Sequence, residues 1–576
     1  MSAVGIDFGT TNSAVAVYGA GGGDVLAIDQ PPPTWEPLGL DKVLPSVVGI
    51  GEGDQATFGW AAKTRSANKL EAVKRLFATE ESVRIGGVEY SVEMVAALLF
   101  ARLKQGAESV GVPVDRAVVT IPANSRGLAR FRTKLCASLA GIDVRALINE
   151  PTAAAMAHSI SASEDSNILV FDWGGGTLDV TVLETVAGVF MERASKGIQR
   201  SGGLDLDNLF ASAVLEQVSG TEQWREGQMA AFRLGIEQAK IVLSTQASTH
   251  VELPDGTVLS LTREMLERAI RGKIEETRGP IDQCLRDLGI GADAIDHLVL
   301  VGGSSKIPAL RQFVSEILNK DPLAGADPMT AVAEGASIAG AILSGELDAD
   351  FFVATEHALG TISFDDREKP EFSVLIGRNH QLPAKETSSY RPLHEGQKSV
   401  EVQVIEGDPN VPLDHPDNVI LKRWDVDIDP TRPLNESGFT MVYEYDVDGI
   451  LHVRVIDEKT GATMLKDDVS FGVSRDKAGL VTLAQSVSAT ISGQPLGPGA
   501  GAGPSHDAAE QQPGLDHESL ALLDRVRTKI IPFIDEQETE KLESMCQELE
   551  GAIGGVVLET CRSALESAAR KYAYLF

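Results

Sequence analysis

The chain has 576 residues, which allows roughly three or four domains of ordinary size. Its 83 acidic and 51 basic residues give a formal net charge of −32, which argues against nucleic acid or an anionic membrane as the main partner, because both bind a basic face. The four cysteines include no C-x-x-C pair, and no leader or long apolar run is visible, so we expect a cytoplasmic protein without disulfides or zinc.

The first predicted element is a hairpin over residues 4–18, VGIDFGTTNSAVAVY. An apolar strand ends at Asp7, a polar turn follows, and a second apolar strand runs over residues 14–18. The turn residues are Gly9, Thr10, Thr11 and Asn12. This stretch predicts a carboxylate next to a turn that can grip phosphate.

Residues 168–185, ILVFDWGGGTLDVTVLET, repeat this pattern with Asp172 and Asp179 at the two ends of a glycine turn. Glycines let backbone N–H groups approach an anion with no Cβ in the way. The carboxylates cannot bind that anion themselves, so they indicate a hydrated Mg²⁺ between them and a polyphosphate. Taken alone, the stretch is equally well explained as a plain β-hairpin.

Two hairpins of one design, far apart in the chain, suggest a duplicated domain whose halves share a cleft. Neither turn contains G-x-x-x-x-G-K-[ST], and no G-x-G-x-x-G follows a predicted strand. A P-loop and a Rossmann dinucleotide site are therefore not indicated.

Two more stretches, INEPTAAAMAH at 148–158 and VLVGGSSKIPALRQF at 299–313, complete a set of four. In order and spacing, the set resembles the two phosphate motifs, the connecting motif and the adenosine motif of the 70-kDa heat-shock proteins, the DnaK-type chaperones. The resemblance suggests a divergent, bacterial-like member. It implies an α/β actin-like two-lobed ATPase domain, followed by a β-sandwich domain and a small α-helical C-terminal segment.

The same resemblance implies ATP or ADP with Mg²⁺ between the lobes, and K⁺ as a further candidate ion. The residues that it assigns to catalysis are Lys74, Glu150, Asp172, Thr177 and Asp179. The residues that would hold the metal, through water, are Asp7, Asp172 and Asp179. The residues assigned to the nucleotide are Asp7, Gly9, Thr10, Thr11, Asn12, Gly174, Gly175, Gly176, Gly202, Gly203, Glu237, Lys240, Ser244, Gly302, Gly303, Ser304 and Lys306.

Some of these residues have simpler interpretations from the sequence alone. Lys74 would be an ordinary surface lysine, and Glu150 a first-turn acid that the helix dipole favours. Glu237 and Lys240 are three residues apart, so they would form a surface salt bridge. Lys306 stands where many relatives carry an arginine that stacks on adenine, and a lysine should stack less well.

The resemblance predicts five segments. Residues 1–345 form the ATPase domain, 346–358 the interdomain linker, 359–475 the β-sandwich that binds peptide, 476–514 a flexible Gly/Pro linker, and 515–576 a short helical lid-like segment. The interdomain linker departs from the family pattern, because only Phe351, Phe352 and Val353 keep its apolar character. Leu393 and Val400 fall near the family's peptide pocket.

The leading hypothesis is an ATP-hydrolysing chaperone that binds and releases unfolded polypeptide segments, with a J-domain co-chaperone and a nucleotide exchange factor as candidate partners. One alternative is a nucleotide-switched partner-binding protein with little ATPase activity. A small-molecule kinase of the same superfamily is the third hypothesis, but a C-terminal sandwich with tethered helices does not supply a closed sugar pocket.

Overall fold

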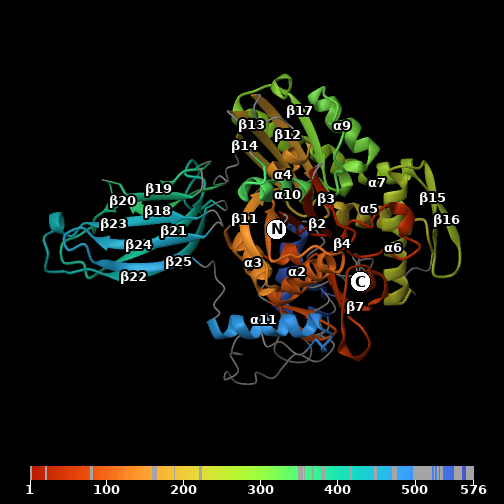
Figure 1. The fold of residues 1–576 in the computed structure, drawn as a ribbon, viewed down its shortest axis with the longest axis horizontal. Helices are drawn as coiled ribbons and strands as arrows, with labels where there is room; N and C mark the ends of the chain where they lie inside the picture. The colour runs from red at the N-terminus through yellow and green to blue at the C-terminus, as the bar shows by residue number, and fades with distance from the viewer. Residues whose placement is uncertain are drawn as a thin grey trace.

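Figure 1 shows the chain as a computed structural model. It describes residues 3–19, 22–77, 82–123, 125, 127–158, 165–186, 189–219, 224–347, 355, 357–365, 367, 369–378, 380, 383–415, 418–446, 450–469, 477–496, 522–523, 526–527, 531, 536–550, 561–562, 564–565 and 568. Among these residues, no helix is long and apolar enough to cross a membrane.

The first sheet belongs to lobe I, which is the half of the predicted two-lobed domain that contains the N-terminus. Its strands follow the order β11-β10-β1-β2-β3, with β4 paired to β2. Their bounds are β1 Val4–Asp7, β2 Asn12–Gly19, β3 Gly22–Val25, β4 Leu44–Pro45, β10 Arg116–Ile121 and β11 Asp143–Asn149. Strand β1 is antiparallel to β2 and parallel to β10.

The second sheet, in lobe II, repeats this arrangement in the order β14-β13-β12-β17. Its strands are β12 Ser166–Trp173, β13 Leu178–Val186, β14 Val189–Ile198 and β17 His297–Val301. Strand β12 is antiparallel to β13 and parallel to β17, as β1 is to β2 and β10. Both predicted hairpins are therefore confirmed, and Asp172 lies directly opposite Asp179 in the register.

Helices α4 (Glu150–Ala157) and α10 (Ala331–Leu343) lie between the two sheets (Figure 1). The two helices touch at Gly335, where an added Cβ would stand 1.7 Å from the carbonyl oxygen of Ala153. Only glycine permits this approach. The buried apolar cluster around these helices includes side chains from both sheets, so the two lobes share a core at their joint.

Further helices and short strands complete the two lobes. In lobe I these are α1 Gly59–Arg65, α2 Val92–Ser109 and α3 Gly127–Leu139, with short strands β5 Val47–Ile50, β6 Ala56–Phe58, β7 Asn68–Glu71, β8 Ser82–Ile85 and β9 Val88–Ser91. In lobe II they are α5 Gly203–Leu215, α6 Glu226–Leu243, α7 Arg263–Glu276, α8 Arg278–Leu288 and α9 Pro308–Leu318, with the hairpin β15 Ser248–Glu252 and β16 Val258–Thr262. Ser91 begins α2 by accepting a hydrogen bond from the backbone N–H of Met94.

Residues 358–469 form two four-stranded antiparallel sheets. The first has the order β19-β18-β21-β22 and the second β20-β23-β24-β25. The bounds are β18 Ala358–Phe364, β19 Pro370–Ile376, β20 Ala384–Tyr390, β21 Ser399–Gly407, β22 Val419–Asp427, β23 Phe439–Tyr445, β24 Leu451–Asp457 and β25 Thr463–Val469. The sheets share one apolar core, and the buried hydroxyl of Tyr443 donates across it to the carbonyl of Gly360 (2.9 Å).

The sandwich lies beside lobe I (Figure 1). Leu128 and Phe131 of α3 pack against the sandwich core. The backbone N–H of Thr355 donates to the carbonyl of His380 (2.9 Å). This hydrogen bond holds Thr355 next to the segment before β20. The predicted linker residues Phe351, Phe352 and Val353 lie outside the described residues.

The predicted flexible linker over 476–514 is wrong in its first part, because Lys477–Ile491 form helix α11. Leu483 and Val487 of this helix are fully buried in the apolar core of lobe I. Leu496 follows, and its N–H donates to the carbonyl of Asp54 (2.9 Å). The apolar residues at a spacing of four match a helix, but in the sequence they run directly into the Gly- and Pro-rich stretch that follows.

Helix α13 (Glu536–Glu550) is the main described part of the predicted lid-like segment. Leu542, Cys546 and Leu549 of this helix form a small apolar core with Leu522, Leu523, Val526 and Leu565. Thr539 accepts a hydrogen bond from Arg200 of lobe II. A role as a lid over the sandwich stays a prediction.

The packing of α11 against the lobe I core can be tested by substitution. We expect Leu483→Ala to lower the free energy of unfolding by about 2–5 kcal/mol, because it leaves a cavity in the lobe I core. Val481→Ala is the matched control, since Val481 lies on the same helix with 56% of its surface exposed. Urea titration of both variants is the measurement, and equal effects of the two changes would contradict the docked helix.

Candidate functional site

A cavity of about 900 Å³ lies between the two sheets, where the two hairpin turns face each other. Nearly all the residues that the sequence assigned to nucleotide and catalysis line it. They are Asp7, Gly9, Thr10, Thr11, Asn12, Lys74, Glu150, Asp172, Gly174, Gly175, Gly176, Thr177, Gly203, Glu237, Lys240, Ser244, Gly302, Gly303, Ser304 and Lys306. Residues as far apart as 7 and 306 therefore meet in one place.

Two predicted residues, Asp179 and Gly202, are not among those that line the cavity. Asp179 is buried and accepts a hydrogen bond from the hydroxyl of Thr177 (2.9 Å). Gly202 lies behind the glycine turn, where an added Cβ would stand 2.5 Å from the backbone of Gly175 and Gly176. Gly202 therefore shapes the second hairpin from behind, whereas Asp179 lies next to the lining residues Asp172 and Thr177.

The two hairpins touch each other across the cavity. An added Cβ on Gly175 would stand 1.5 Å from the hydroxyl oxygen of Thr11, and one on Gly176 would stand 2.7 Å from Thr10. Glycine is therefore required for this contact, as well as for access of an anion to the backbone. The Thr11 hydroxyl is buried without a hydrogen-bond partner, so it is available to a phosphate oxygen.

Lys74 and Glu150 form a buried ion pair on the lobe I side. Lys74, on the short helix η3 (Val73–Leu76), donates to the carboxylate of Glu150 (2.9 Å) and to the carbonyl of Phe8 (2.6 Å). Glu150 is the first residue of α4. The interpretation of Lys74 as an ordinary surface lysine is therefore wrong, because Lys74 is one of the residues that line the cavity.

The carboxylates near this pair have raised pKa values. Burial, and then the charge of Glu150, raise the pKa of Asp7 to about 7, although Lys74 and a hydrogen bond from Thr120 (3.0 Å) oppose the shift. Burial, and then Glu150, Asp179 and Asp7, raise the pKa of Asp172 well above its ordinary value. Such crowded carboxylates fit a bound cation, whose charge would relieve their repulsion.

Lys240 on α6 pairs with Asp207, a residue that the sequence motifs did not assign to the site. The lysine donates to the carboxylate of Asp207 (2.7 Å) and to the carbonyl of Gly203 (3.0 Å). Burial raises the pKa of Asp207 to about 6, although Lys240 opposes the shift. The simpler interpretation of Glu237 and Lys240 as a surface salt bridge is therefore wrong, because each pairs with another residue. The only sequence signal for Asp207 was its place in GGLDLDN, four residues after Gly203.

Comparison with known proteins agrees with this geometry. A family model described as "Hsp70 protein" matches residues 78–469. The chain is also 33% identical over 478 residues to the chaperone protein DnaK of Methanothermobacter thermautotrophicus, an alignment that covers 80% of this chain and 78% of the relative. The chain belongs to the Hsp70 family.

Membership of the Hsp70 family has three consequences. Hsp70 proteins are ATPases, and they bind ATP or ADP together with a divalent cation. The protein is accordingly an ATP-dependent chaperone, and the alternative of a nucleotide-switched protein with little ATPase activity is not favoured. The family also implies the two-lobed actin-like ATPase domain to which the two related sheets correspond.

In this Hsp70 protein, a buried ion pair joins the two lobes at the cavity wall. Lys63 of α1 donates to the carboxylate of Glu237 of α6 at 2.6 Å, and its side chain is only 5% exposed. Its ammonium group also lies 5.1 Å from the ring centre of Trp35 and 5.9 Å from that of Trp60. Burial alone would lower the pKa of Lys63, but Glu237 and Glu71 raise it above its ordinary value.

The motif at 299–313 forms the opposite wall of the cavity. Gly302 has a positive φ of 81°, and an added Cβ would stand 2.3 Å from the carbonyl oxygen of Trp173, so only glycine fits. The hydroxyl of Ser304 donates to the carbonyl of Gly174 (3.1 Å). Lys306 forms an ion pair with Asp327 (2.7 Å) at the edge of the cavity.

The predicted peptide-pocket residues lie in the sandwich. Leu393 is 43% exposed and precedes β21, whereas Val400 is buried in the shared core of the two sheets. Their role in binding peptide stays a prediction.

The ion pair between Lys63 and Glu237 predicts a barrier to nucleotide release. We expect Glu237→Gln to accelerate release of ADP roughly tenfold, because losing about 1.4 kcal/mol from a buried pair across the cleft favours opening. Stopped-flow release of a fluorescent ADP analogue is the measurement. The control is Glu264→Gln, since Glu264 forms an exposed pair with Arg268 (2.8 Å).

Variants of Lys63 show whether the faster release of ADP comes from loss of the ion pair or from loss of a direct contact between Glu237 and the nucleotide. If the ion pair is responsible, Lys63→Gln produces the same acceleration and the double variant adds little to it. Additive effects of the two changes would contradict a shared pair.

The raised pKa of Asp7 predicts pH-dependent binding of a divalent cation. The pKa of about 7 means that Asp7 is partly protonated near pH 7 without a cation. As a proposed ligand of the cation it would lose its proton on binding, so affinity should rise with pH. For a single group with a pKa of about 7, the gain between pH 6 and pH 8 is about 10-fold. Titration with Mn²⁺ in the absence of nucleotide, followed by paramagnetic resonance of the free ion, measures it. The gain should shrink in Asp7→Asn and persist in Asp255→Asn, an exposed control; equal affinity at both pH values in the unaltered protein would refute the expectation.

Proposed function

We propose that this Hsp70 protein binds Mg²⁺ and ATP between its two lobes, hydrolyses the ATP, and uses the cycle to bind and release unfolded polypeptide segments. The observation that carries the proposal is the meeting of two carboxylate-bearing hairpins and the ion pair of Lys74 and Glu150 in one cavity. A bound Mg²⁺ would neutralise charge on the transferring phosphate.

The two hairpin turns are proposed to hold the β- and γ-phosphates. Thr10 and Thr11 offer hydroxyls from lobe I, and the backbone N–H groups of 174–176 approach from lobe II. Because both turns belong to rigid paired strands, the phosphates are positioned before the reaction. Phosphoryl transfer depends mainly on such positioning and on charge stabilisation.

Lys74 and Glu150 are proposed to act on the attacking water and the developing charge. The ammonium group of Lys74 is held by Glu150 and by the carbonyl of Phe8, so it is preorganised before ATP binds. Glu150 can accept a hydrogen bond from a water molecule on its free side. No side chain has to become covalently modified.

Asp7, Asp172 and Asp179 are proposed to hold the Mg²⁺ through its water shell, and a K⁺ ion is a further candidate at the same site. Mg²⁺ keeps several waters when it binds with polyphosphate, and acidic groups contact those waters. Thr177 supports this arrangement because its hydroxyl holds Asp179 in place (2.9 Å).

The sandwich is proposed to hold extended polypeptide, with Leu393 and Val400 near the binding pocket. Two direct contacts connect it and the following helix to the ATPase domain: α3 packs on the sandwich core, and α11 is buried in lobe I. Such contacts offer a route from the nucleotide to the polypeptide. A J-domain co-chaperone, a nucleotide exchange factor and a cytoplasmic location belong to the same proposal.

We expect Lys74→Ala to bind ATP but to hydrolyse it about 10²–10³-fold more slowly, because the variant lacks one preorganised charge. Single-turnover hydrolysis and ATP affinity are the measurements. Lys104→Ala is the control, since Lys104 lies on α2 and bonds the carbonyl of Gly141 (2.8 Å), away from the cavity. Hydrolysis by Lys74→Ala at the unaltered rate would remove Lys74 from the mechanism.

The chaperone cycle needs a second measurement in the same samples. ATP should accelerate release of a fluorescent unfolded peptide from the unaltered protein. If ATP is bound and hydrolysed while peptide release stays constant, the two activities are not coupled. Binding of ATP without any turnover would instead support a nucleotide-switched binding protein.

A further inference from the structure

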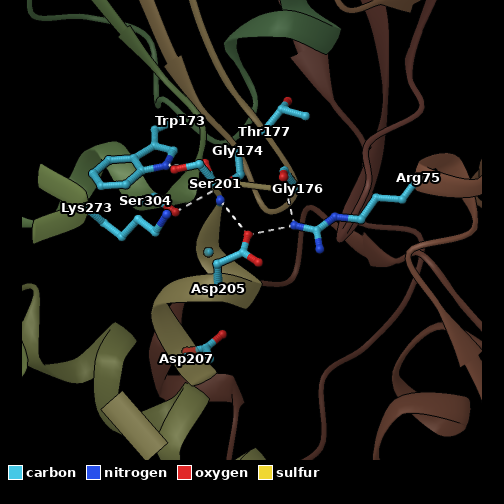
Figure 2. Close-up of polar contacts among 12 residues, drawn as sticks. Arg75, Trp173, Gly174, Gly176, Thr177, Ser201, Asp205, Asp207, Lys273 and Ser304 are labelled. Carbon is cyan, nitrogen blue, oxygen red and sulfur yellow. Dashed lines mark hydrogen bonds and ion pairs between the residues drawn. The ribbon is translucent and has the colours of Figure 1, made fainter. Parts of the chain in front are cut away.

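Lys74 and Arg75 are neighbours on η3 of lobe I, but their side chains bind different lobes. Lys74 bonds Phe8 and Glu150 within lobe I. Arg75 crosses to lobe II, where its Nη2 donates to the carbonyl of Gly176 (2.7 Å) and to the carboxylate of Asp205 (2.8 Å) (Figure 2). Arg75 is not among the residues that line the cavity, so it acts on the site from behind.

The ion pair between Arg75 and Asp205 is buried on both sides. The two side chains are 7% and 8% exposed. Burial raises the pKa of Asp205, and the charge of Arg75 opposes that shift. Separating the lobes at this point would leave two uncompensated buried charges, so the pair favours the closed arrangement.

One oxygen of Asp205 makes two contacts at once. Its Oδ2 accepts from Arg75 and also from the backbone N–H of Gly202 (2.7 Å), which starts helix α5. The next two N–H groups, of Gly203 and Leu204, donate to the carbonyls of Gly174 (2.9 Å) and Gly175 (3.0 Å). The start of α5 and the phosphate hairpin of lobe II therefore form one hydrogen-bonded unit, which Arg75 holds at two points.

The other end of this connection is fixed in lobe I. Arg132 of α3 donates to the backbone carbonyl of Phe77 (2.5 Å), directly after η3, and forms a buried ion pair with Glu93 of α2 (2.9 Å). Because Lys74 and Arg75 are adjacent, their Cα atoms are about 3.8 Å apart. The position of the lobe II hairpin is therefore set relative to Lys74 through a short, rigid path.

We propose that Arg75 is a positioning residue for ATP hydrolysis: it places the glycine turn of lobe II in register with Lys74. The inference rests on the proposed ATPase function of the cavity and names a residue of that site which the sequence motifs left without a role. Arg75 touches no reacting atom. It links closure of the cleft to the alignment of the γ-phosphate with Lys74.

The test compares hydrolysis with binding. We expect Arg75→Lys and Asp205→Asn to lower the single-turnover rate by roughly 10- to 100-fold, because small misplacements in a catalytic site have effects of this size. ATP affinity should stay within about threefold, since the hairpin itself remains. The conservative variants are used first, because Arg75→Ala leaves Asp205 buried without its partner. Arg75→Ala should be at least as slow as Arg75→Lys.

Arg102→Ala is the matched control. Arg102 forms an ion pair with Asp29 (3.1 Å) that stays within lobe I, so its loss tests the effect of removing a partly buried arginine alone. The control should keep both rate and affinity. An equal loss of rate in Arg102→Ala, or an unaltered rate in the Arg75 variants, would overturn the proposal.

A second readout is independent of hydrolysis. With ADP bound, amide hydrogen exchange at Gly203 and Leu204 should be faster by about 10-fold in Arg75→Lys than in the unaltered protein, because these N–H groups bond the hairpin. If the unaltered protein fails to hydrolyse ATP, the proposed function fails, and the exchange measurement still decides the position of Arg75. Unchanged exchange in Arg75→Lys would overturn the positioning role.

Discussion

The two phosphate hairpins approach each other so closely that only glycine fits between them, and the rest of the ATPase domain depends on this contact. Thr11 occupies the space that a Cβ on Gly175 would need. The hairpins are far apart in the chain, so their meeting requires both sheets to be formed and joined. Helices α4 and α10 make that joint, and it too requires a glycine, Gly335.

Two charged pairs connect the lobes around the cavity. Lys63 with Glu237, and Arg75 with Asp205, each cross from lobe I to lobe II and are mostly buried. Burial of an ion pair adds little net stability because removing two charges from water costs nearly as much as their attraction provides. Such pairs instead distinguish one arrangement from others, since a shifted lobe would leave the charges unpaired.

The carboxylates inside the cavity have the opposite character, because they repel one another. Asp7 and Asp172 have raised pKa values owing to burial and then to the charge of Glu150. Lys74 opposes both shifts but does not cancel them. The protein thus holds a set of acidic groups that a cation and a polyphosphate would stabilise. The energy for this arrangement comes from the apolar cores of the two lobes.

The sequence by itself determined the two hairpins and the order of the motifs, and nearly all the site residues that it assigned do line the cavity. This was possible because strands, tight turns and glycine requirements depend on neighbouring residues. The sequence did not determine which charges pair. Lys240 binds Asp207, and Glu237 binds Lys63. Glu237 and Lys63 are 174 positions apart in the chain. The sequence also did not reveal α11 as a buried helix. Its apolar side chains are buried only because α2 packs against them. Those features were decided by tertiary structure, since each depends on a partner from a distant part of the chain.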